Sequence, residues 1–314
     1  AVTIDFQEGC SMTKLSGKAV VFNVAAILVA GSAVAGAARS WLIKPSVAPC
    51  ETRYSNVLAF KLERDGRVLT PVDLQGRAGG RDQGLDQNVQ IGAEPGAPKP
   101  VAMKVRLPAG DSASITGMTF PWEPANVRPR NAACLVYNVR LSDSFDASHD
   151  GLLPGLQGAA EDEEQRFVIS PAWLKSGETG IATEIVLKRE AGDAPPIEKP
   201  RMELENANAT LPKGRWLRVN QEVVLNTPAE NDGIVRVWID GKLIVDRTDV
   251  RMRNDKSVGF TGVAARAHAI AEGGKWAAQA ESTVTLTPFE LMWCEGAGGA
   301  SLAPLLQHAR HCVH

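Results

Sequence analysis

The segment from Lys213 to Asp246 constrains the fold more than any other part of the chain, because it predicts three consecutive antiparallel strands. Residues 216–226 alternate between apolar and polar side chains, which is the period of a strand with one buried face. Turn signals occupy residues 227–228 (Thr-Pro) and 231–233 (Asn-Asp-Gly). Residues 240–241 (Asp-Gly) fit a two-residue hairpin turn of type I′. We therefore expect a three-stranded antiparallel meander.

Strand-like runs separated by Gly- and Pro-containing turns continue through most of the chain, and they predict an all-β sandwich or barrel. The chain has 314 residues, with 29 Gly and 19 Pro, which is enough for one large all-β domain with extensions. The clearest further strands are expected at residues 101–107, 135–141, 166–173, 181–187, 258–271 and 282–293.

Three other segments have less regular patterns. Residues 57–69 suggest two strands around Asp65-Gly66. Residues 71–100 are rich in Gly, Asp, Gln and Pro and are predicted to form a long surface loop. Residues 120–124 (Phe-Pro-Trp-Glu-Pro) are predicted to form a rigid aromatic turn. Trp122 in this turn either stacks on a sugar or packs at the edge of the core.

The N-terminal region has the pattern of an export signal. Lys14 and Lys18 precede an uncharged run over residues 19–38, and residues 35–37 (Ala-Gly-Ala) fit a signal-peptidase site. A run of this length can also span a bilayer as an uncleaved membrane anchor. We therefore expect a secreted or periplasmic protein, with cleavage and a retained anchor both open.

Charge and motifs limit the partners. The formal net charge is -2, so no overall field favours nucleic acid or an anionic membrane surface. An anionic polymer would need a local basic cleft. The sequence has no P-loop, dinucleotide-binding glycine motif or nucleophile elbow, and we expect no cofactor. His308, His311 and His314 lie close together in sequence, but no upstream residues complete a metal site with them, and we expect no metal.

The five cysteines have no spacing typical of zinc sites. In an oxidising compartment a bridge between Cys134 and Cys294 is one option. Buried free thiols are the other, and the sequence does not decide between them.

The predicted meander also carries a family resemblance. Its pattern W-x-R-x-x-Q-x-V-x-L-N-x-P-x-x-N-D-G-x-x-x-V-W-x-D-G-K, residues 216–242, resembles the family 14 polysaccharide lyases, which include alginate and glucuronan lyases. A second match, in the expected order, is Phe145-Asp146 followed by residues 153–156 (Leu-Pro-Gly-Leu) and Gly158. The resemblance covers roughly residues 100–293 and implies a β-jelly roll, a sandwich of two antiparallel sheets.

With this resemblance the chain divides into four parts. They are an N-terminal extension with the signal peptide or anchor (1–40), a spacer and loop-rich part (41–100), the jelly-roll domain (101–293) and a C-terminal tail (294–314).

The resemblance also implies a catalytic set, which this chain does not match. A uronate lyase must neutralise the sugar carboxylate, remove the C5 proton and protonate the departing O4. The family uses a lysine, an arginine and a Tyr-x-Tyr pair, and the corresponding positions here are Leu152, Ser170, Ala182 and Glu184. The whole chain has only two tyrosines, so the paired-tyrosine device is absent.

Other residues are candidates for the lost roles. His149 lies just before the position of the family's lysine and is either a catalytic base or a surface-loop residue. Lys175 follows the expected strand at 166–173 and is a second catalytic candidate. Tyr137 is either a base or strand filler. For substrate binding we expect Gln221, Asn226, Trp173 and Arg218; Gln221 either lines a cleft or makes a satisfied buried hydrogen bond.

These observations favour an exported polysaccharide-lyase-like protein that cleaves an anionic, uronic-acid-containing polysaccharide by β-elimination. A non-catalytic glycan-binding or cell-envelope protein on the same scaffold is the alternative, and a structural protein with no sugar ligand is a third. Exposed Trp122, Trp173 or Trp276 on a concave face would favour binding. Burial of these tryptophans would favour the structural role.

Overall fold

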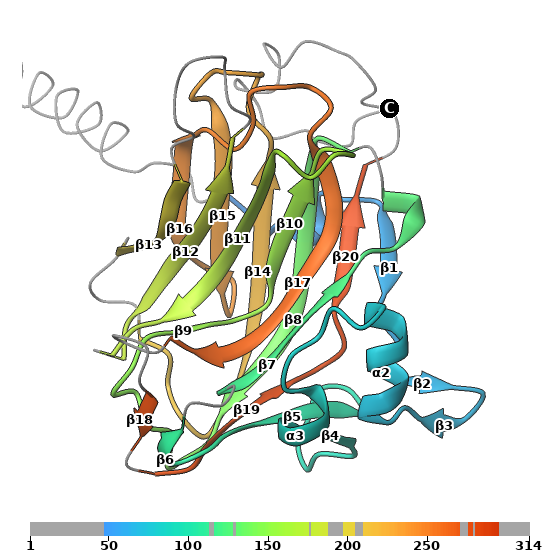
Figure 1. Ribbon diagram of the computed structural model, residues 1–314, viewed down its shortest axis with the longest axis vertical. Coiled ribbons are helices and arrows are strands. Elements are labelled where there is room, and N and C mark those ends of the chain that lie inside the picture. Colours follow the sequence, from blue (N-terminus) through green and yellow to red (C-terminus); the bar gives the residue numbers. More distant parts are fainter. Residues whose placement is uncertain are drawn as a thin grey trace, which may run out of the picture. The chain divides into compact units, whose positions relative to one another are not determined.

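A computed structural model describes residues 47–112, 116–127, 130–175, 177–187, 197–204, 210–270, 276–278 and 280–294 (Figure 1). Two antiparallel sheets dominate it, one of nine strands and one of seven. The sequence correctly predicts this all-β class and two-sheet architecture.

The nine-stranded sheet contains the predicted meander at one edge and runs in the order β16-β15-β14-β8-β19-β5-β4, with β20 pairing with β8 and β1 pairing with β20. Its strands are β1 (Asn56–Ala59), β4 (Val89–Gly92), β5 (Ala102–Leu107), β8 (Ala132–Leu141), β14 (Trp216–Val224), β15 (Gly233–Ile239), β16 (Lys242–Val250), β19 (Ser282–Leu286) and β20 (Glu290–Trp293).

The seven-stranded sheet runs in the order β10-β17-β9-β11-β12-β13, with β7 added on β17. Its strands are β7 (Gly117–Trp122), β9 (Gly151–Leu152), β10 (Gly155–Ala159), β11 (Arg166–Trp173), β12 (Thr179–Val186), β13 (Ile197–Leu204) and β17 (Gly259–Ala269). Figure 1 shows β17 as a long curved strand beside β7 and β10.

Short elements complete the described chain. They are η1 (Cys50–Thr52), the hairpin of β2 (Glu63–Arg64) and β3 (Arg67–Val68), α2 (Pro71–Ala78), α3 (Leu85–Asn88), η2 (Ala125–Val127), and the pair of β6 (Gly110–Ser112) and β18 (Trp276–Ala278).

The inner faces of the two sheets share one hydrophobic core. Leu217 and Val219 of β14 contribute to it from the nine-stranded sheet, and Phe167 and Ile169 of β11 contribute from the seven-stranded sheet. All four are fully buried. Each such side chain stabilises the fold by roughly 1.5–3 kcal/mol relative to exposure, so the alternation along these strands fixes which face is turned inward.

The meander forms as predicted. β14 pairs with β15, and β15 pairs with β16. The turn between β15 and β16 has positive φ at both Asp240 (49°) and Gly241 (77°), as a type I′ turn requires. Local turn chemistry therefore sets this register.

The glycines of the L-P-G-L-x-G segment are explained by close strand packing. A Cβ on Gly155 would lie 2.1 Å from the carbonyl oxygen of Ile169, and one on Gly158 would lie 2.4 Å from the carbonyl oxygen of Gly259. β10 lies between β11 and β17 and makes both approaches. The match of this segment to the lyases therefore reports on the fold.

Two local predictions are wrong. Residues 71–100 are not one loop, because they contain α2, α3 and β4. Helix α2 begins with a capping box in which Thr70 and Asp73 satisfy each other's backbone N–H groups. Residues 120–122 are not a turn but the end of β7, where Trp122 packs against Phe60 with ring centroids 5.1 Å apart.

Neither alternative left open for Cys134, a bridge to Cys294 or a buried free thiol, is correct. Cys134 forms a disulfide with Cys50, and their Cα atoms are 5.9 Å apart. This bond fixes η1 to β8 on the outer face of the nine-stranded sheet. The Trp238 indole N–H also binds this segment, donating to the carbonyl oxygen of Val47 at 2.9 Å.

The predicted signal or anchor at residues 19–38 and the histidines at 308–314 lie outside the described residues. None of the described helices is long and apolar enough to cross a bilayer.

Candidate active site

The outer face of the seven-stranded sheet collects the positions at which the resemblance implies catalytic groups. Ser170 of β11 lies opposite Ala182 of β12, and Leu152 of β9 lies opposite Ala172. Glu184 follows two residues after Ala182 on the same strand. Directly opposed residues share a face, as do residues two apart on one strand, so these positions all point away from the core.

Two of these positions, Leu152 and Ala182, carry apolar side chains in place of the family's reactive groups. Leu152, Ala172 and Ala182 form a small buried cluster, with Ile270 packed against it. The hydroxyl of Ser170 is buried and has no hydrogen-bond partner among the residues that the structure describes. The departure from the family's catalytic set therefore corresponds to an apolar patch on the sheet.

A groove of about 230 Å³ lies farther along the same face. Arg266 of β17 binds Glu184 of β12 at 3.1 Å, and Arg166 at the start of β11 lies 3.7 Å from the same carboxylate. The other charged and amide residues that line the groove are Arg81, Glu123, Gln157 and Glu163.

Polar contacts also hold the groove residues Arg81, Glu123 and Gln157 in place. Arg81 pairs with Glu123 at 2.7 Å. The amide nitrogen of Gln157 donates to the other oxygen of Glu123 at 2.9 Å. Because three arginines and three glutamates line the groove, it offers charged hydrogen-bonding groups of both signs and fits a sugar that carries hydroxyls and a carboxylate.

His268 lies on this face and was not singled out in the sequence. It is partly exposed and lies opposite Leu152 of β9 and Gly117 of β7. Burial lowers the pKa of His268, and the nearby positive charge of Arg266 lowers it further. The Arg-x-His spacing of residues 266 and 268 within a predicted strand is the sequence signal that places both on one face.

The structure brings two predicted catalytic residues to one end of this sheet. The carboxylate of Asp150 accepts a hydrogen bond from the backbone N–H of Lys175 at 2.7 Å. His149 precedes Asp150, and its Nδ1 lies 2.9 Å from the hydroxyl of Ser148. His149 and Lys175 are thus neighbours beside β9 and the end of β11, and their catalytic roles stay predictions.

Tyr137 and Trp173, in contrast, are each only 1% exposed and lie in the core. The hydroxyl of Tyr137 donates to the carbonyl oxygen of Pro154 at 3.1 Å, and burial raises its pKa well above the usual value. The Trp173 ring packs edge-on against Phe145, and its indole N–H donates to the carbonyl oxygen of His149 at 3.0 Å. Neither side chain is presented to a polymer.

The predicted binding residues Gln221 and Asn226 are fully buried. The Gln221 amide joins the two sheets: its oxygen accepts from the backbone N–H of Leu156 at 3.0 Å, and its nitrogen donates to the carbonyl oxygen of Ile169 at 2.7 Å. The Asn226 oxygen accepts from the backbone N–H of Met252 at 2.8 Å. Of the two alternatives for Gln221, the structure has the satisfied buried hydrogen bond.

Arg218 lies on the other side of the sandwich. It points outward from β14, opposite to the core residues Leu217 and Val219, and its Nε donates to the carboxylate of Glu51 at 3.0 Å. The core separates Arg218 from the groove. The predicted substrate-binding residues are therefore not gathered in one place.

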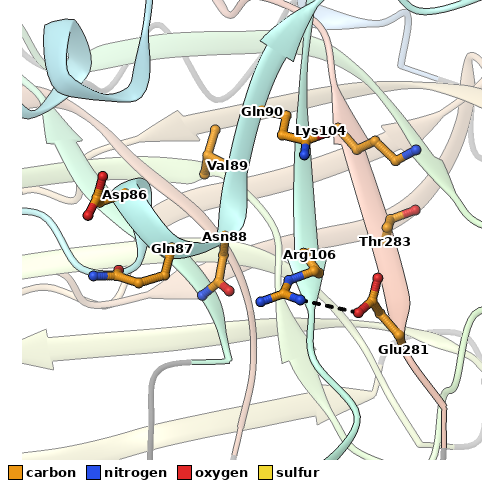
Figure 2. A pocket seen from close by; sticks show the side chains of 9 residues that line it. All are labelled: Asp86, Gln87, Asn88, Val89, Gln90, Lys104, Arg106, Glu281 and Thr283. Carbon is orange, nitrogen blue, oxygen red and sulfur yellow. Dashed lines mark hydrogen bonds and ion pairs between the residues drawn. The ribbon is translucent and has the colours of Figure 1, made fainter.

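A larger hollow, of about 350 Å³, lies against the nine-stranded sheet beside α3 (Figure 2). Lys104 and Arg106 project from β5, and Arg106 pairs with Glu281 at 3.4 Å. Gln90 and Thr283 face them from β4 and β19. None of the positions implied by the resemblance lies here, so size alone does not identify the active site.

Metal ligands do not gather anywhere in the part of the chain that the structure describes: no group of three His, Cys, Asp or Glu side chains is placed to hold an ion.

Comparisons with known proteins support the lyase resemblance. The family described as Polysaccharide lyase 14 matches residues 183–289, which include the whole meander. No curated protein sequence matches the chain significantly.

Solved structures give the same fold. The PL-14 alginate lyase from Aplysia kurodai superposes with a TM-score of 0.56 at 21% identity, covering 68% of this chain and 89% of the lyase. The alginate lyase vAL-1 from Chlorella virus superposes with a TM-score of 0.54 at 15% identity, covering 71% of this chain and 97% of the viral lyase. Alginate lyase Aly36B superposes with a TM-score of 0.51 at 15% identity, covering 76% of this chain and 97% of the lyase. The described part of the chain is a polysaccharide lyase 14-like β-jelly roll.

Proposed function

We propose that this protein cleaves a uronic-acid-containing polysaccharide by β-elimination, on the outer face of the seven-stranded sheet. The observation that carries the proposal is the Arg166–Glu184–Arg266 group, which lies on the face of the lyase-like positions. Within this group two guanidinium groups share one carboxylate, so the group itself carries one net positive charge. Guanidinium groups bind carboxylates in a bidentate manner.

Neutralising the substrate carboxylate is the first requirement of this reaction, because it makes the C5 proton acidic. The groove supplies cations for that purpose, although the family's lysine, arginine and tyrosine positions are changed. Alginate is the substrate that the structural relatives suggest, and the family resemblance adds glucuronan.

Export belongs to the same proposal. The uncharged run at residues 19–38 acts as a cleaved signal or as a membrane anchor, and the polymer is met outside the cytoplasm. The Cys50–Cys134 disulfide supports this, since such bonds persist in oxidising compartments.

Non-catalytic glycan binding is a second candidate, which one specific observation favours. Leu152 and Ala182 occupy two of the four positions of the family's reactive groups, and neither side chain can transfer a proton. A protein that only held the polymer would lose those groups and keep the charged groove.

One assay separates the two candidates. The full chain is incubated with alginate, polyglucuronate and a neutral glucan, and the ultraviolet absorbance of the unsaturated product is followed against a heat-inactivated control. We expect a rise with at least one uronate polymer and none with the glucan. Binding of a uronate polymer without any rise in absorbance would replace the lyase proposal by the binding proposal. If the protein shows no binding and no rise in absorbance, both proposals are refuted.

A further inference from the structure

His268 has a distinctive place on the outer face of the seven-stranded sheet. It lies opposite Leu152, the position at which the resemblance implies a catalytic lysine. Directly opposed residues in an antiparallel pair have Cβ atoms about 4.5–5.5 Å apart. The imidazole therefore stands next to the place where a proton-transferring side chain has been lost.

The imidazole contacts define which nitrogen can accept a proton. Nδ1 lies 3.3 Å from the carbonyl oxygen of Ala269. A carbonyl oxygen only accepts, so Nδ1 carries the hydrogen in this contact and Nε2 keeps its lone pair. The structure records no hydrogen bond from Nε2 to a described residue. Because burial and Arg266 lower the pKa of His268, the ring is neutral near pH 7 and competent as a base.

The surroundings supply one cation close to this base. Arg266 is two residues earlier on β17 and on the same face, about 6.6 Å away along the strand. The facing residues are Leu152 from β9 and Gly117 from β7, neither of which titrates. Glu184 binds Arg266 at 3.1 Å and orients its guanidinium group. A neutral base and a carboxylate-binding cation are thus placed side by side.

We propose, resting on the lyase function above, that His268 is the catalytic base and that Arg266 binds the carboxylate of the uronate under attack. The C5–H bond breaks and its proton passes to Nε2. The electron pair forms the C4=C5 double bond, and the C4–O4 bond breaks. The departing O4 takes the proton back from the imidazolium, which restores the neutral base and leaves one unsaturated chain end.

The test is the His268→Gln variant, assayed with the uronate polymer that the wild-type protein cleaves. We expect kcat to fall by about 10²–10⁴-fold with KM little changed, because only proton transfer is removed. In the wild-type protein kcat/KM should decrease as the pH falls through the lowered pKa of His268, since the imidazolium cannot accept a proton. The Lys104→Gln variant, altered on the other sheet, should keep the wild-type rate.

The outcomes distinguish this inference from the proposed function. A cleaving wild-type protein whose His268→Gln variant keeps more than a tenth of kcat would overturn the role of His268 and leave the lyase function standing. A variant with weakened polymer binding and unchanged kcat would make His268 a binding residue only. A wild-type protein that cleaves no uronate polymer would refute the lyase function, and the base assignment with it.

Discussion

Replacing Glu222 by alanine is expected to lower the free energy of unfolding by about 3–5 kcal/mol. Glu222 is fully buried on the outer side of β14, beneath the segment that contains η1. Its carboxylate pairs with Arg53 at 2.8 Å and with Arg236 at 3.2 Å, and it accepts from the Tyr54 hydroxyl at 2.9 Å. Without it, two nearly buried guanidinium groups would lose a shared counter-charge.

Denaturant unfolding of the full chain measures this effect. The matched control is Glu281→Ala, because the Arg106–Glu281 pair is about half exposed on both sides. Exposed pairs contribute only about 0–1 kcal/mol, so the control should unfold close to the wild-type midpoint. A Glu222→Ala variant as stable as the control would show that the buried ion pairs do not hold this segment in place.

Replacing Gln221 by leucine is expected to lower the free energy of unfolding by about 2–6 kcal/mol. The change keeps the volume of the side chain but removes both hydrogen bonds that cross between the sheets. The backbone N–H of Leu156 and the carbonyl oxygen of Ile169 would stay buried without partners, at about 1–3 kcal/mol each. The destabilised strands would be β10 and β11, which belong to the sheet with the proposed active face.

The control for this change is Gln90→Leu, at an exposed position of β4. Both variants are compared with the wild-type protein by denaturant unfolding and by their activity. We expect a shifted midpoint only for Gln221→Leu. An unshifted midpoint would mean that water or a backbone shift satisfies the two buried backbone groups, and that the Gln221 hydrogen bonds do not stabilise the contact between the sheets.

The parts of the fold that the sequence predicted are those set by neighbouring residues. The meander follows from strand alternation and from turn chemistry such as Asp240-Gly241, both of which act over a few residues. The capping box of Thr70 and Asp73 is equally local, but the Gly-, Pro- and Asp-rich composition around it led to the prediction of a loop. The loop was predicted because composition was given more weight than the helix N-terminal signal of Thr70 and Asp73.

The site depended on contacts between distant parts of the chain. Gln221 meets partners 52 and 65 residues away, so its own strand could not show whether it lines a cleft or joins two sheets. The partner of Cys134 is 84 residues distant. His268 becomes noticeable only when β17 is placed beside β9. Alternation places a residue on a face, but only the order of the strands determines which residues meet there.

The proposed function requires that the polymer binds the outer face of the seven-stranded sheet. Affinity electrophoresis in gels containing alginate or polyglucuronate compares Arg166→Glu, in the groove, with Arg106→Glu, beside the larger hollow on the other sheet. The two arginines are equally exposed, at 51% and 50%, and each lies near one glutamate.

We expect Arg166→Glu to weaken binding by at least about tenfold, or about 1.4 kcal/mol, while Arg106→Glu binds as the wild-type protein does. Weakened binding for Arg106→Glu with no change for Arg166→Glu would contradict the proposed site and place the polymer on the nine-stranded sheet.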